Sequence, residues 1–269
     1  MSSTDDRIVI ITGASSGIGL ASAKLFAQKG CRVYGISRGR VALPEVKGVT
    51  FISADVTDEA GVKAAIDNIA AEEGRIDLLI NNAGFGISGA AEFTEIEEAK
   101  RQLDVNLFGT MACTKAVLPY MRKIGGMILN MSSVAAVVPI PFQAFYSASK
   151  AAINSFTMAL ANELRRNEKK VRVAALMPGD VKTGFTAARA KQERGADVYP
   201  ALEKSVATME HDEQNGMEPA VLAKRAYRIS LKKKPKPLYS CGLMYQFFCV
   251  LAKILPCRLV EWILGLMYA

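Results

Sequence analysis

The sequence predicts a single-domain α/β protein built on a doubly wound parallel sheet. Six short apolar segments, most of them rich in β-branched residues, alternate with longer helix-like segments over residues 7–176. This alternation is typical of a parallel sheet covered by helices on both faces. A glycine-rich turn directly follows the first apolar segment. With 269 residues, the chain is long enough for one large domain, residues 1–269, with a substantial core.

Composition and charge exclude several classes of function. Half of the residues are hydrophobic, which excludes a disordered chain. The net charge is +8, but the only basic cluster is Lys232–Lys236 and no aromatic residue interrupts it, so we expect no nucleic-acid partner. The five cysteines form no C-x-x-C pair and the single histidine, His211, is interpreted as a surface loop residue, so we expect no metal site. The polar first residues, without a signal peptide, favour the cytoplasm.

The first strand, residues 7–12, leads into a turn that predicts dinucleotide binding. Gly13, Gly17 and Gly19 lie in this turn, and a helix is expected over residues 20–29. Glycines allow positive φ and close backbone approach, and free N–H groups at a helix N-terminus bind pyrophosphate. The spacing is G-x-x-x-G-x-G rather than G-x-G-x-x-G. A Rossmann-type fold is therefore expected, and a simple strand-to-helix turn is the alternative.

The end of the second strand, residues 32–36, predicts which dinucleotide binds. A carboxylate at this position binds the ribose 2′-hydroxyl of NAD, whereas an arginine binds the 2′-phosphate of NADP. Ser37 and Arg38 occupy the position, with Arg40 close by and no carboxylate. We therefore expect NADP(H), with an ordinary surface arginine as the alternative.

The next two strands, residues 49–52 and 76–80, flank a helix that ends near Glu73. Asn81-Asn82-Ala83-Gly84 follows the second of them. Paired amides and a glycine at the carboxyl end of a parallel strand suit backbone approach to a ligand. A long helix over residues 95–122 is expected to be interrupted near Gly109 and Pro119.

That long helix contains Asn106 among apolar neighbours, where a buried amide needs hydrogen-bond partners. A fifth strand, residues 126–131, ends at Ser132-Ser133. The helix that follows extends to about Asn167 and contains Tyr146 and Lys150 on one face, four residues apart. A nearby ammonium favours the phenolate and lowers the pKa of a tyrosine, which would allow proton exchange near neutral pH. Two exposed residues on an amphipathic helix are the alternative.

The last third of the chain follows a sixth strand, residues 171–176. Residues 180–218 are polar and irregular, which predicts a substrate-binding lid. A helix over residues 219–231 precedes the apolar C-terminal extension 238–269. Charges and Pro256 interrupt this extension before it reaches the ~20 residues of a membrane span. Core or dimer packing, a wall of an apolar pocket, and an amphipathic membrane contact all remain open.

The motifs described so far, in this order, resemble those of the short-chain dehydrogenase/reductase family over about residues 7–185. They are Thr12-Gly13…Gly17…Gly19, Asp55, Asn81–Gly84, Asn106, Ser133, Tyr146 with Lys150, and Pro178-Gly179.

The resemblance implies specific roles. Tyr146 is the general acid for ketone reduction and the general base for alcohol oxidation. Lys150 lowers the pKa of Tyr146 and binds the nicotinamide ribose, Ser133 hydrogen-bonds the substrate oxygen, and Asn106 positions a water in a proton relay. The implied cofactor-binding residues are Gly13, Ser15, Ser16, Gly17, Ile18, Gly19, Arg38, Asp55, Val56, Asn82, Ala83, Gly84, Tyr146, Lys150, Val181 and Thr183. The implied substrate-binding residues are Ser133, Tyr146, Phe85 and Phe185.

The expected function is NADPH-dependent interconversion of a ketone and a secondary alcohol on a hydrophobic substrate. The resemblance favours a hydroxysteroid, with acyl-dihydroxyacetone phosphate or another lipid ketone as one alternative and a non-catalytic dinucleotide sensor as another. It also implies a homodimer or homotetramer that associates through the helices around residues 105–122 and 146–166. A cytoplasmic protein is expected, with peripheral contact to a membrane left open.

Overall fold

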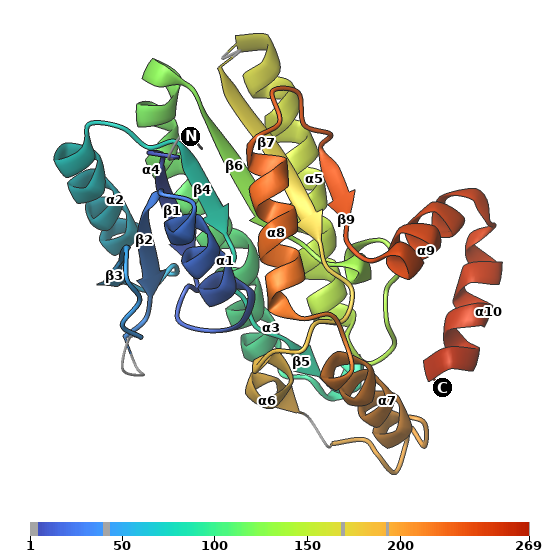
Figure 1. Cartoon of the computed structure of the whole chain (residues 1–269). Helices are drawn as coiled ribbons and strands as arrows, with labels where there is room; N and C mark the ends of the chain where they lie inside the picture. The colour runs from blue at the N-terminus through green and yellow to red at the C-terminus, as the bar shows by residue number, and fades with distance from the viewer. Residues whose placement is uncertain (1–4, 40–43, 168–169, 192–193, 269) are drawn as a thin grey trace.

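A computed structural model describes residues 5–39, 44–167, 170–191 and 194–268. Its main sheet is entirely parallel, with the strand order β3-β2-β1-β4-β6-β7-β9 (Figure 1). These strands are β1 (Ile8–Thr12), β2 (Arg32–Ser37), β3 (Val49–Ser53), β4 (Leu78–Asn81), β6 (Gly126–Met131), β7 (Val171–Met177) and β9 (Leu238–Ser240). The predicted doubly wound sheet is confirmed. A seventh strand, β9, was expected to be part of the apolar extension and instead pairs with β7.

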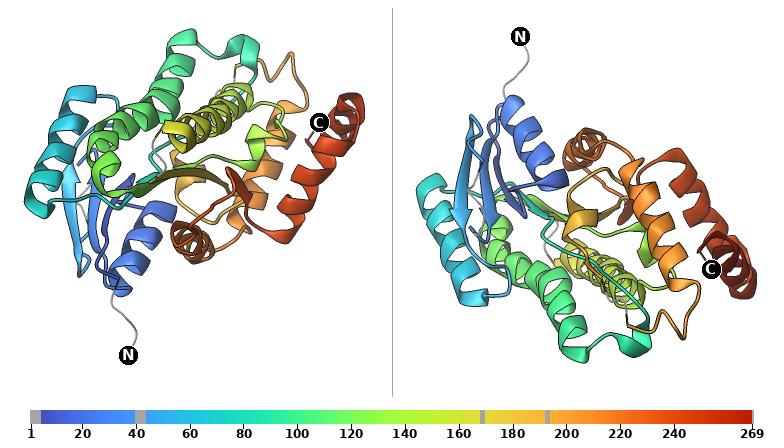
Figure 2. Two further views of the ribbon diagram at one scale, coloured as in Figure 1. Left: turned by 90° about the horizontal axis from the view of Figure 1, so that it is seen from above. Right: turned by 90° about the horizontal axis from the view of Figure 1, so that it is seen from below.

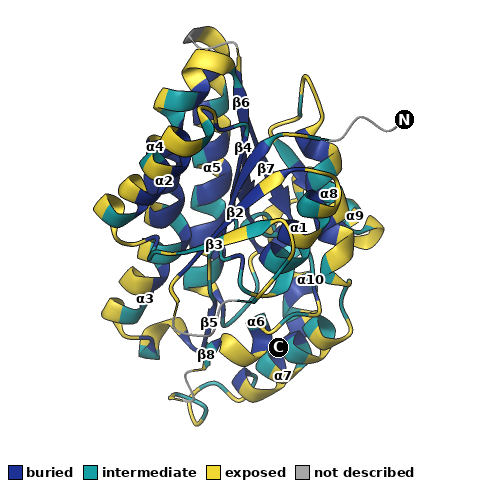
Figure 3. Ribbon diagram, turned by 60° about the vertical axis from the view of Figure 1, so that its left-hand side comes forward, coloured by how far each residue is buried: buried dark blue, intermediate teal, exposed yellow. Residues whose placement is uncertain are grey.

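Helices cover both faces of the sheet. On one face α1 (Gly17–Gln28) packs against α8 (Pro219–Ser230). On the other lie α2 (Glu59–Glu73), α4 (Gly109–Ile124) and α5 (Ala144–Asn167) (Figure 2). The strands between them are largely buried, whereas the outward sides of the helices are exposed (Figure 3). Burial on two faces explains why the strands read as unbroken apolar runs.

The long helix expected over residues 95–122 is two helices. Helix α3 (Ile96–Leu103) and α4 are joined by a π-helical turn, Asp104–Phe108. The expected interruption therefore falls just before Gly109, whose missing Cβ would lie 2.8 Å from Val56 Cγ2. Pro119 lies inside α4 and does not interrupt it, which corrects that prediction.

The segment expected as an irregular lid contains regular structure. Helices α6 (Phe185–Ala188) and α7 (Leu202–Gln214) lie within it, and β8 (Ala190–Lys191) pairs with β5 (Ile87–Ser88). His211 is exposed but belongs to α7 rather than to a loop. Single 3-10 turns, η1 (Ala91–Phe93) and η3 (Val134–Ala136), complete the short elements.

The chain ends in two helices beyond the β9 edge of the sheet (Figure 1). Helix α9 spans Leu243–Ile254 and α10 spans Cys257–Tyr268, and Pro256 lies in the break between them. Met209 of α7 packs with Leu264 and Tyr268 of α10. None of the described helices combines the length and hydropathy that crossing a bilayer requires.

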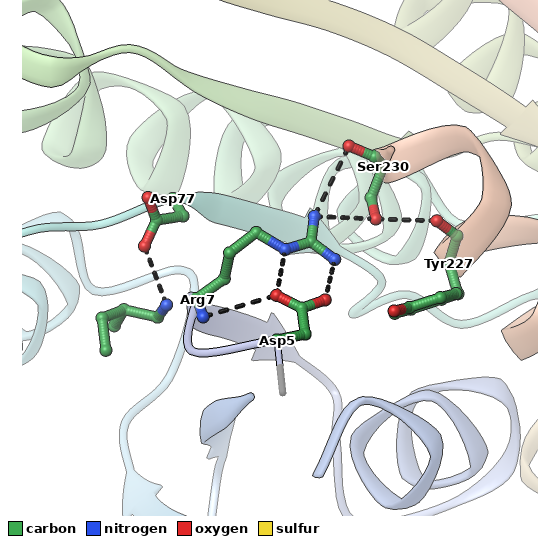
Figure 4. A network of polar contacts seen from close by, with 6 residues as sticks. Asp5, Arg7, Asp77, Tyr227 and Ser230 are labelled. Carbon is green, nitrogen blue, oxygen red and sulfur yellow. Dashed lines mark hydrogen bonds and ion pairs between the residues drawn. The ribbon is translucent and has the colours of Figure 1, made fainter. Parts of the chain in front are cut away.

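A polar network ties the start of β1 to α8 (Figure 4). The Arg7 guanidinium donates to Asp5 Oδ1 at 2.7 Å and to Ser230 Oγ at 3.0 Å. Ser230 Oγ in turn donates to the Tyr227 carbonyl oxygen at 2.8 Å, and the Ile8 amide donates to Asp77 Oδ2 at 2.9 Å. These contacts fix the first strand, and with it the glycine turn at its other end.

Candidate active site

A cavity of about 830 Å³ lies at the carboxyl ends of the strands. Segments that follow β1, β4, β6 and β7 all contribute to its lining. The strand order reverses between β1 and β4, and ligands of open α/β sheets bind at such a switch point. The cavity therefore lies where the topology predicts a ligand.

Tyr146, Lys150 and Ser133 line this cavity together. Tyr146 and Lys150 come from the first two turns of α5, and the Lys150 Nζ atom lies 5.7 Å from the centroid of the Tyr146 ring. Ser133 follows β6 and caps the η3 turn, where its hydroxyl accepts from the Ala135 amide at 3.1 Å. The structure thus brings three of the four expected catalytic residues to one wall.

The expected lowering of the Tyr146 pKa is not observed. Burial raises the pKa of Tyr146 to about 12, and the nearby Glu213 carboxylate also raises it. A hydrogen bond with Ser133 opposes this shift. The removal of the phenol from water outweighs the lowering of its pKa by Ser133 and by the Arg189 cation. At neutral pH Tyr146 is therefore a protonated phenol, ready to donate a proton.

Lys150 is almost fully buried, with 5% of its surface exposed. Its Nζ donates to the Met131 carbonyl oxygen at 2.9 Å, and its own carbonyl oxygen accepts from Ser132 Oγ at 3.0 Å. Burial lowers the pKa of Lys150 to about 8 because the ammonium is removed from water. The ammonium form still predominates at neutral pH.

Asn106 lies behind the cavity wall and does not line it. Its side chain is buried in the π-helical turn, where Oδ1 accepts from the Phe85 amide at 3.0 Å. Its Nδ2 donates to the Phe85 carbonyl oxygen at 3.1 Å and to Ser149 Oγ at 3.0 Å. These three hydrogen bonds supply the partners that a buried amide was expected to need. Its expected role in positioning a water stays a prediction.

The glycine turn forms a cradle at one end of the cavity. Gly13 and Gly17 have φ values of +65° and +52°, which favour glycine. A Cβ on Gly13 would lie 2.9 Å from Ala83 Cα, so the turn and the segment after β4 touch through backbone. Gly19 does not line the cavity; a Cβ there would lie 2.2 Å from the Gly13 carbonyl oxygen, so it permits close packing of α1.

Asn82 holds this cradle in shape. Its Nδ2 donates to the carbonyl oxygens of Thr12 at 3.0 Å and Gly13 at 3.2 Å, and Thr12 Oγ1 accepts from the backbone amides of Asn82 and Ala83. Of the two amides predicted to lie where backbone approaches a ligand, Asn82 thus also holds the turn, whereas Asn81 Nδ2 donates to Thr114 Oγ1 and Asn130 Oδ1. Other expected cofactor-binding residues that line the cavity are Ser15, Ser16, Ile18, Asp55, Val56, Gly84, Val181 and Thr183.

Arg38 lines the far end of the cavity, just after β2, and its residue is exposed. This is the strand end at which the sequence predicted a contact with the ribose of the dinucleotide. Arg40, expected as a second cation, lies outside the described residues. Asp55 Oδ1 accepts from the Thr57 backbone amide at 3.0 Å and hydroxyl at 2.8 Å, which orders the loop after β3.

The opposite end of the cavity is the expected substrate side. Phe185 packs against Tyr146 with ring centroids 5.7 Å apart, and Phe85 lies beneath the Arg101 guanidinium. Sequence reasoning left open whether the C-terminal helices reach this site. They do, and their lining residues include Met244, Tyr245, Phe248, Leu251, Leu255, Ile263, Leu264 and Tyr268.

Three carboxylates on the same side were not predicted from the sequence. Asp180, Asp212 and Glu213 line the cavity. Asp180 accepts from the Tyr245 hydroxyl at 2.5 Å, and burial followed by repulsion from the other two carboxylates raises its pKa. Glu213 pairs with the buried Arg189. The polar pattern of residues 180–218 predicted a lid, but it did not indicate that these three carboxylates face a cavity.

The residues present fit a nicotinamide dinucleotide. The glycine cradle leaves room for a pyrophosphate, Arg38 lies at one end, and Lys150 and Tyr146 lie at the other. Gly84 lies against the catalytic residues, since a Cβ there would lie 3.0 Å from Asn106 Oδ1 and 3.5 Å from Lys150 Nζ. Within the described residues, no group of three or more His, Cys, Asp or Glu side chains could hold a metal ion.

Comparisons with known proteins agree with this geometry. A family model described as short chain dehydrogenase matches residues 7–194. The chain is 38% identical to 3-ketodihydrosphingosine reductase from Bacteroides thetaiotaomicron over 98% of both chains. It is 34% identical to 11-beta-hydroxysteroid dehydrogenase-like 3 from Arabidopsis thaliana, over 71% of this chain and 64% of that protein.

A solved structure shows the same fold. 3-Ketoacyl-(acyl-carrier-protein) reductase from Brucella melitensis, complexed with NADH, has a TM-score of 0.74 and 30% sequence identity and covers 90% of this chain and 98% of that one. Fold and site together define an oxidoreductase with a nicotinamide-dinucleotide cavity. The chain belongs to the short-chain dehydrogenase/reductase family.

Proposed function

We propose that this protein reduces the ketone of a long-chain amino ketone of the 3-ketodihydrosphingosine type, with NADPH as the hydride donor. The observation that carries the proposal is the match to 3-ketodihydrosphingosine reductase over 98% of both chains. That match includes the C-terminal helices, which line the substrate side of the cavity. This favours the lipid-ketone alternative over the hydroxysteroid that the motifs alone suggested.

The shape and charge of the cavity support such a substrate. Leu251, Leu255 and Ile263 give its C-terminal wall an apolar surface that suits an alkyl chain. Near Tyr146, Asp180 offers a carboxylate to a cationic amino group, and Asp212 lines the same cavity close enough to raise the pKa of Asp180. Asp212 makes no hydrogen bond or ion pair with the described residues, so a substrate ammonium would supply a partner for it.

Tyr146 acts as the proton donor. When bound, the dinucleotide supplies a hydride to the carbonyl carbon. The Tyr146 hydroxyl gives its proton to the carbonyl oxygen, so the C=O double bond becomes a C–O single bond and one C–H bond and one O–H bond form. A pKa of about 12 keeps this hydroxyl protonated at neutral pH, which favours reduction as the working direction. Ser133 holds the carbonyl oxygen in line with the phenol.

Lys150 stabilises the tyrosinate that the proton transfer leaves behind. Its ammonium faces the Tyr146 ring at 5.7 Å, and its pKa of about 8 means that it is charged at neutral pH. A buried positive charge interacts strongly with a developing phenolate, because little water screens it. As pH rises through about 8 the ammonium loses its charge, and the rate of reduction should fall.

Arg38 supports NADPH over NADH. It is the residue at the end of β2 that lines the cavity with a positive charge, and no carboxylate accompanies it there. A guanidinium forms charge-assisted hydrogen bonds with the 2′-phosphate, which only NADPH carries.

A substrate panel tests the proposal. The ratio kcat/KM is measured with NADPH for 3-ketodihydrosphingosine, for its N-acylated form, which has no ammonium, and for a ketosteroid. We expect the free amine to be the best substrate and Asp212→Asn to reduce its advantage over the N-acylated ketone. Asp197→Asn, at an exposed position away from the cavity, is the matched control. A preference for the ketosteroid would favour the hydroxysteroid alternative, and no turnover of any ketone would favour a sensor.

A further inference from the structure

Helices α9 and α10 carry apolar side chains on their solvent side as well as on the side that lines the cavity. On α9 the outer stripe is Leu243, Phe247, Val250 and Ile254, at the i, i+4, i+7, i+11 spacing of one helix face. On α10 it continues with Leu259, Trp262 and Leu266. Leu243 is 87% exposed and Trp262 is 62% exposed.

These residues form the main exposed apolar surface in the part of the chain that the structure describes. Of sixteen exposed large hydrophobic side chains there, nine lie on these two helices. Single exposed apolar residues are ordinary, but a contiguous group marks a contact surface. We call this surface the C-terminal apolar face: Leu243, Met244, Phe247, Val250, Ile254, Leu259, Trp262, Leu266 and Met267.

The C-terminal part of the sequence, which contains this face, also carries the net positive charge of the chain. Residues 219–269 contain nine Lys and Arg residues and one acidic residue, Glu261, so their net charge of +8 equals that of the whole chain. Lys253 and Arg258 lie on α9 and α10 themselves, and both are exposed. An apolar face accompanied by cations is the composition of a helix that binds anionic lipid.

The same two helices lie between the outer stripe and the substrate cavity, and Met244 and Met267 of the C-terminal apolar face also line that cavity. Leu251 and Leu255 of α9 and Ile263 of α10 line the cavity from the inside, while the outer stripe faces away from it. Figures 1 and 2 show both helices as the outermost layer beyond β9. An apolar molecule would therefore cross one helix layer between this surface and Tyr146.

We propose that α9 and α10 dock this protein on a bilayer that contains anionic lipid, with both helices lying in the plane of the interface. Each helix has 12 residues and is about 18 Å long, shorter than the ~30 Å hydrocarbon core. In-plane docking buries the apolar stripe and leaves Lys253 and Arg258 at the headgroups. Docking would place the cavity next to the phase in which a long-chain substrate dissolves.

Trp262 provides the test, because it is the only tryptophan in the chain. Its fluorescence is recorded while vesicles of phosphatidylcholine, with or without phosphatidylglycerol, are added to the full-length protein. We expect a blue shift that requires phosphatidylglycerol, and quenching by lipids brominated on their acyl chains. Phe247→Ser should weaken vesicle affinity about tenfold. Val221→Ser, at an exposed apolar position on α8, is the matched control and should leave it unchanged.

Vesicle binding is measured without turnover, so its failure is distinct from a failure to reduce a lipid ketone. An emission maximum unmoved by vesicles, or a shift without quenching by brominated lipid, would overturn the assignment. The assignment would also be overturned if the blue shift depended on protein concentration rather than on lipid, and if Phe247→Ser had a lower oligomeric mass than wild type. That result would make the C-terminal apolar face a contact between copies of the chain. Far-UV circular dichroism of Phe247→Ser verifies that the variant folds.

Discussion

Replacing the buried lysine with Lys150→Met should change how stability depends on pH. Burial lowers the pKa of Lys150 from its ordinary 10.5 to about 8. The pKa of Lys150 is lower in the folded protein than in the unfolded chain, so burying the charged ammonium costs stability. This cost is present in full at pH values below about 8. This cost decreases as pH rises from 8 to 10.5. At about 1.4 kcal/mol for each pKa unit, the cost at neutral pH is about 3 kcal/mol.

Urea unfolding of the cofactor-free protein at pH 7 and at about pH 10 measures this effect. Between these values the wild-type free energy of unfolding should rise by about 2 to 3 kcal/mol relative to that of Lys150→Met. The variant also loses the hydrogen bond to the Met131 carbonyl oxygen. That loss acts equally at both pH values, so it cancels from the comparison.

Lys224→Met, at an exposed position on α8, is the control and should follow the wild-type pH dependence. Identical pH dependence for wild type and Lys150→Met would refute the reasoning. It would mean that water reaches the Lys150 ammonium, and its role as a buried charge beside Tyr146 would fail with it.

Three further substitutions test other parts of the site. Arg38→Ala should raise the Kd for NADPH about ten- to a hundredfold more than that for NADH; equal losses in a fluorescence titration would show that Arg38 only packs. Gly19→Ala places a Cβ 2.2 Å from the Gly13 carbonyl oxygen, so urea unfolding should show a loss of about 1–3 kcal/mol, and unchanged stability would contradict the contact. Asn106→Ala removes the acceptor of the Phe85 amide, while the Phe85 carbonyl oxygen keeps Gln102 Nε2 as a donor, so hydrogen exchange of the Phe85 amide should accelerate; unchanged exchange would contradict a role for this hydrogen bond.

The sheet and cofactor turn could be predicted because their physics is local. A short, unbroken apolar run such as Ile8–Ile11 is typical of a strand that is buried on both faces of a sheet. Glycines at positions that need positive φ identify the turn after it. Strand β9 escaped prediction because it has three residues and its partner, β7, lies about 60 positions earlier in the chain.

The substrate side could not be predicted because it depends on tertiary packing. In α7 only Leu202, Ser205 and Met209 are buried, so its sequence carries a weak helical pattern. Helices α9 and α10 are apolar on both sides, and periodicity cannot assign a face to such helices. The pKa of Tyr146 is raised, whereas a lowered pKa was predicted. The four-residue spacing in a helix indicates that an ammonium is nearby, but it does not show that the phenol is removed from water.

The most direct test of the central claim is hydride and proton transfer to a long-chain amino ketone at Tyr146. The wild-type protein and Tyr146→Phe are each incubated with NADPH deuterated at the transferred C4 position and with 3-ketodihydrosphingosine, and the alcohol is analysed by mass spectrometry. We predict one deuterium at the carbinol carbon with wild type. We expect a rate about 10² to 10⁴ lower with Tyr146→Phe, whose NADPH affinity should be nearly unchanged. Near-normal deuterated product from Tyr146→Phe would contradict the account.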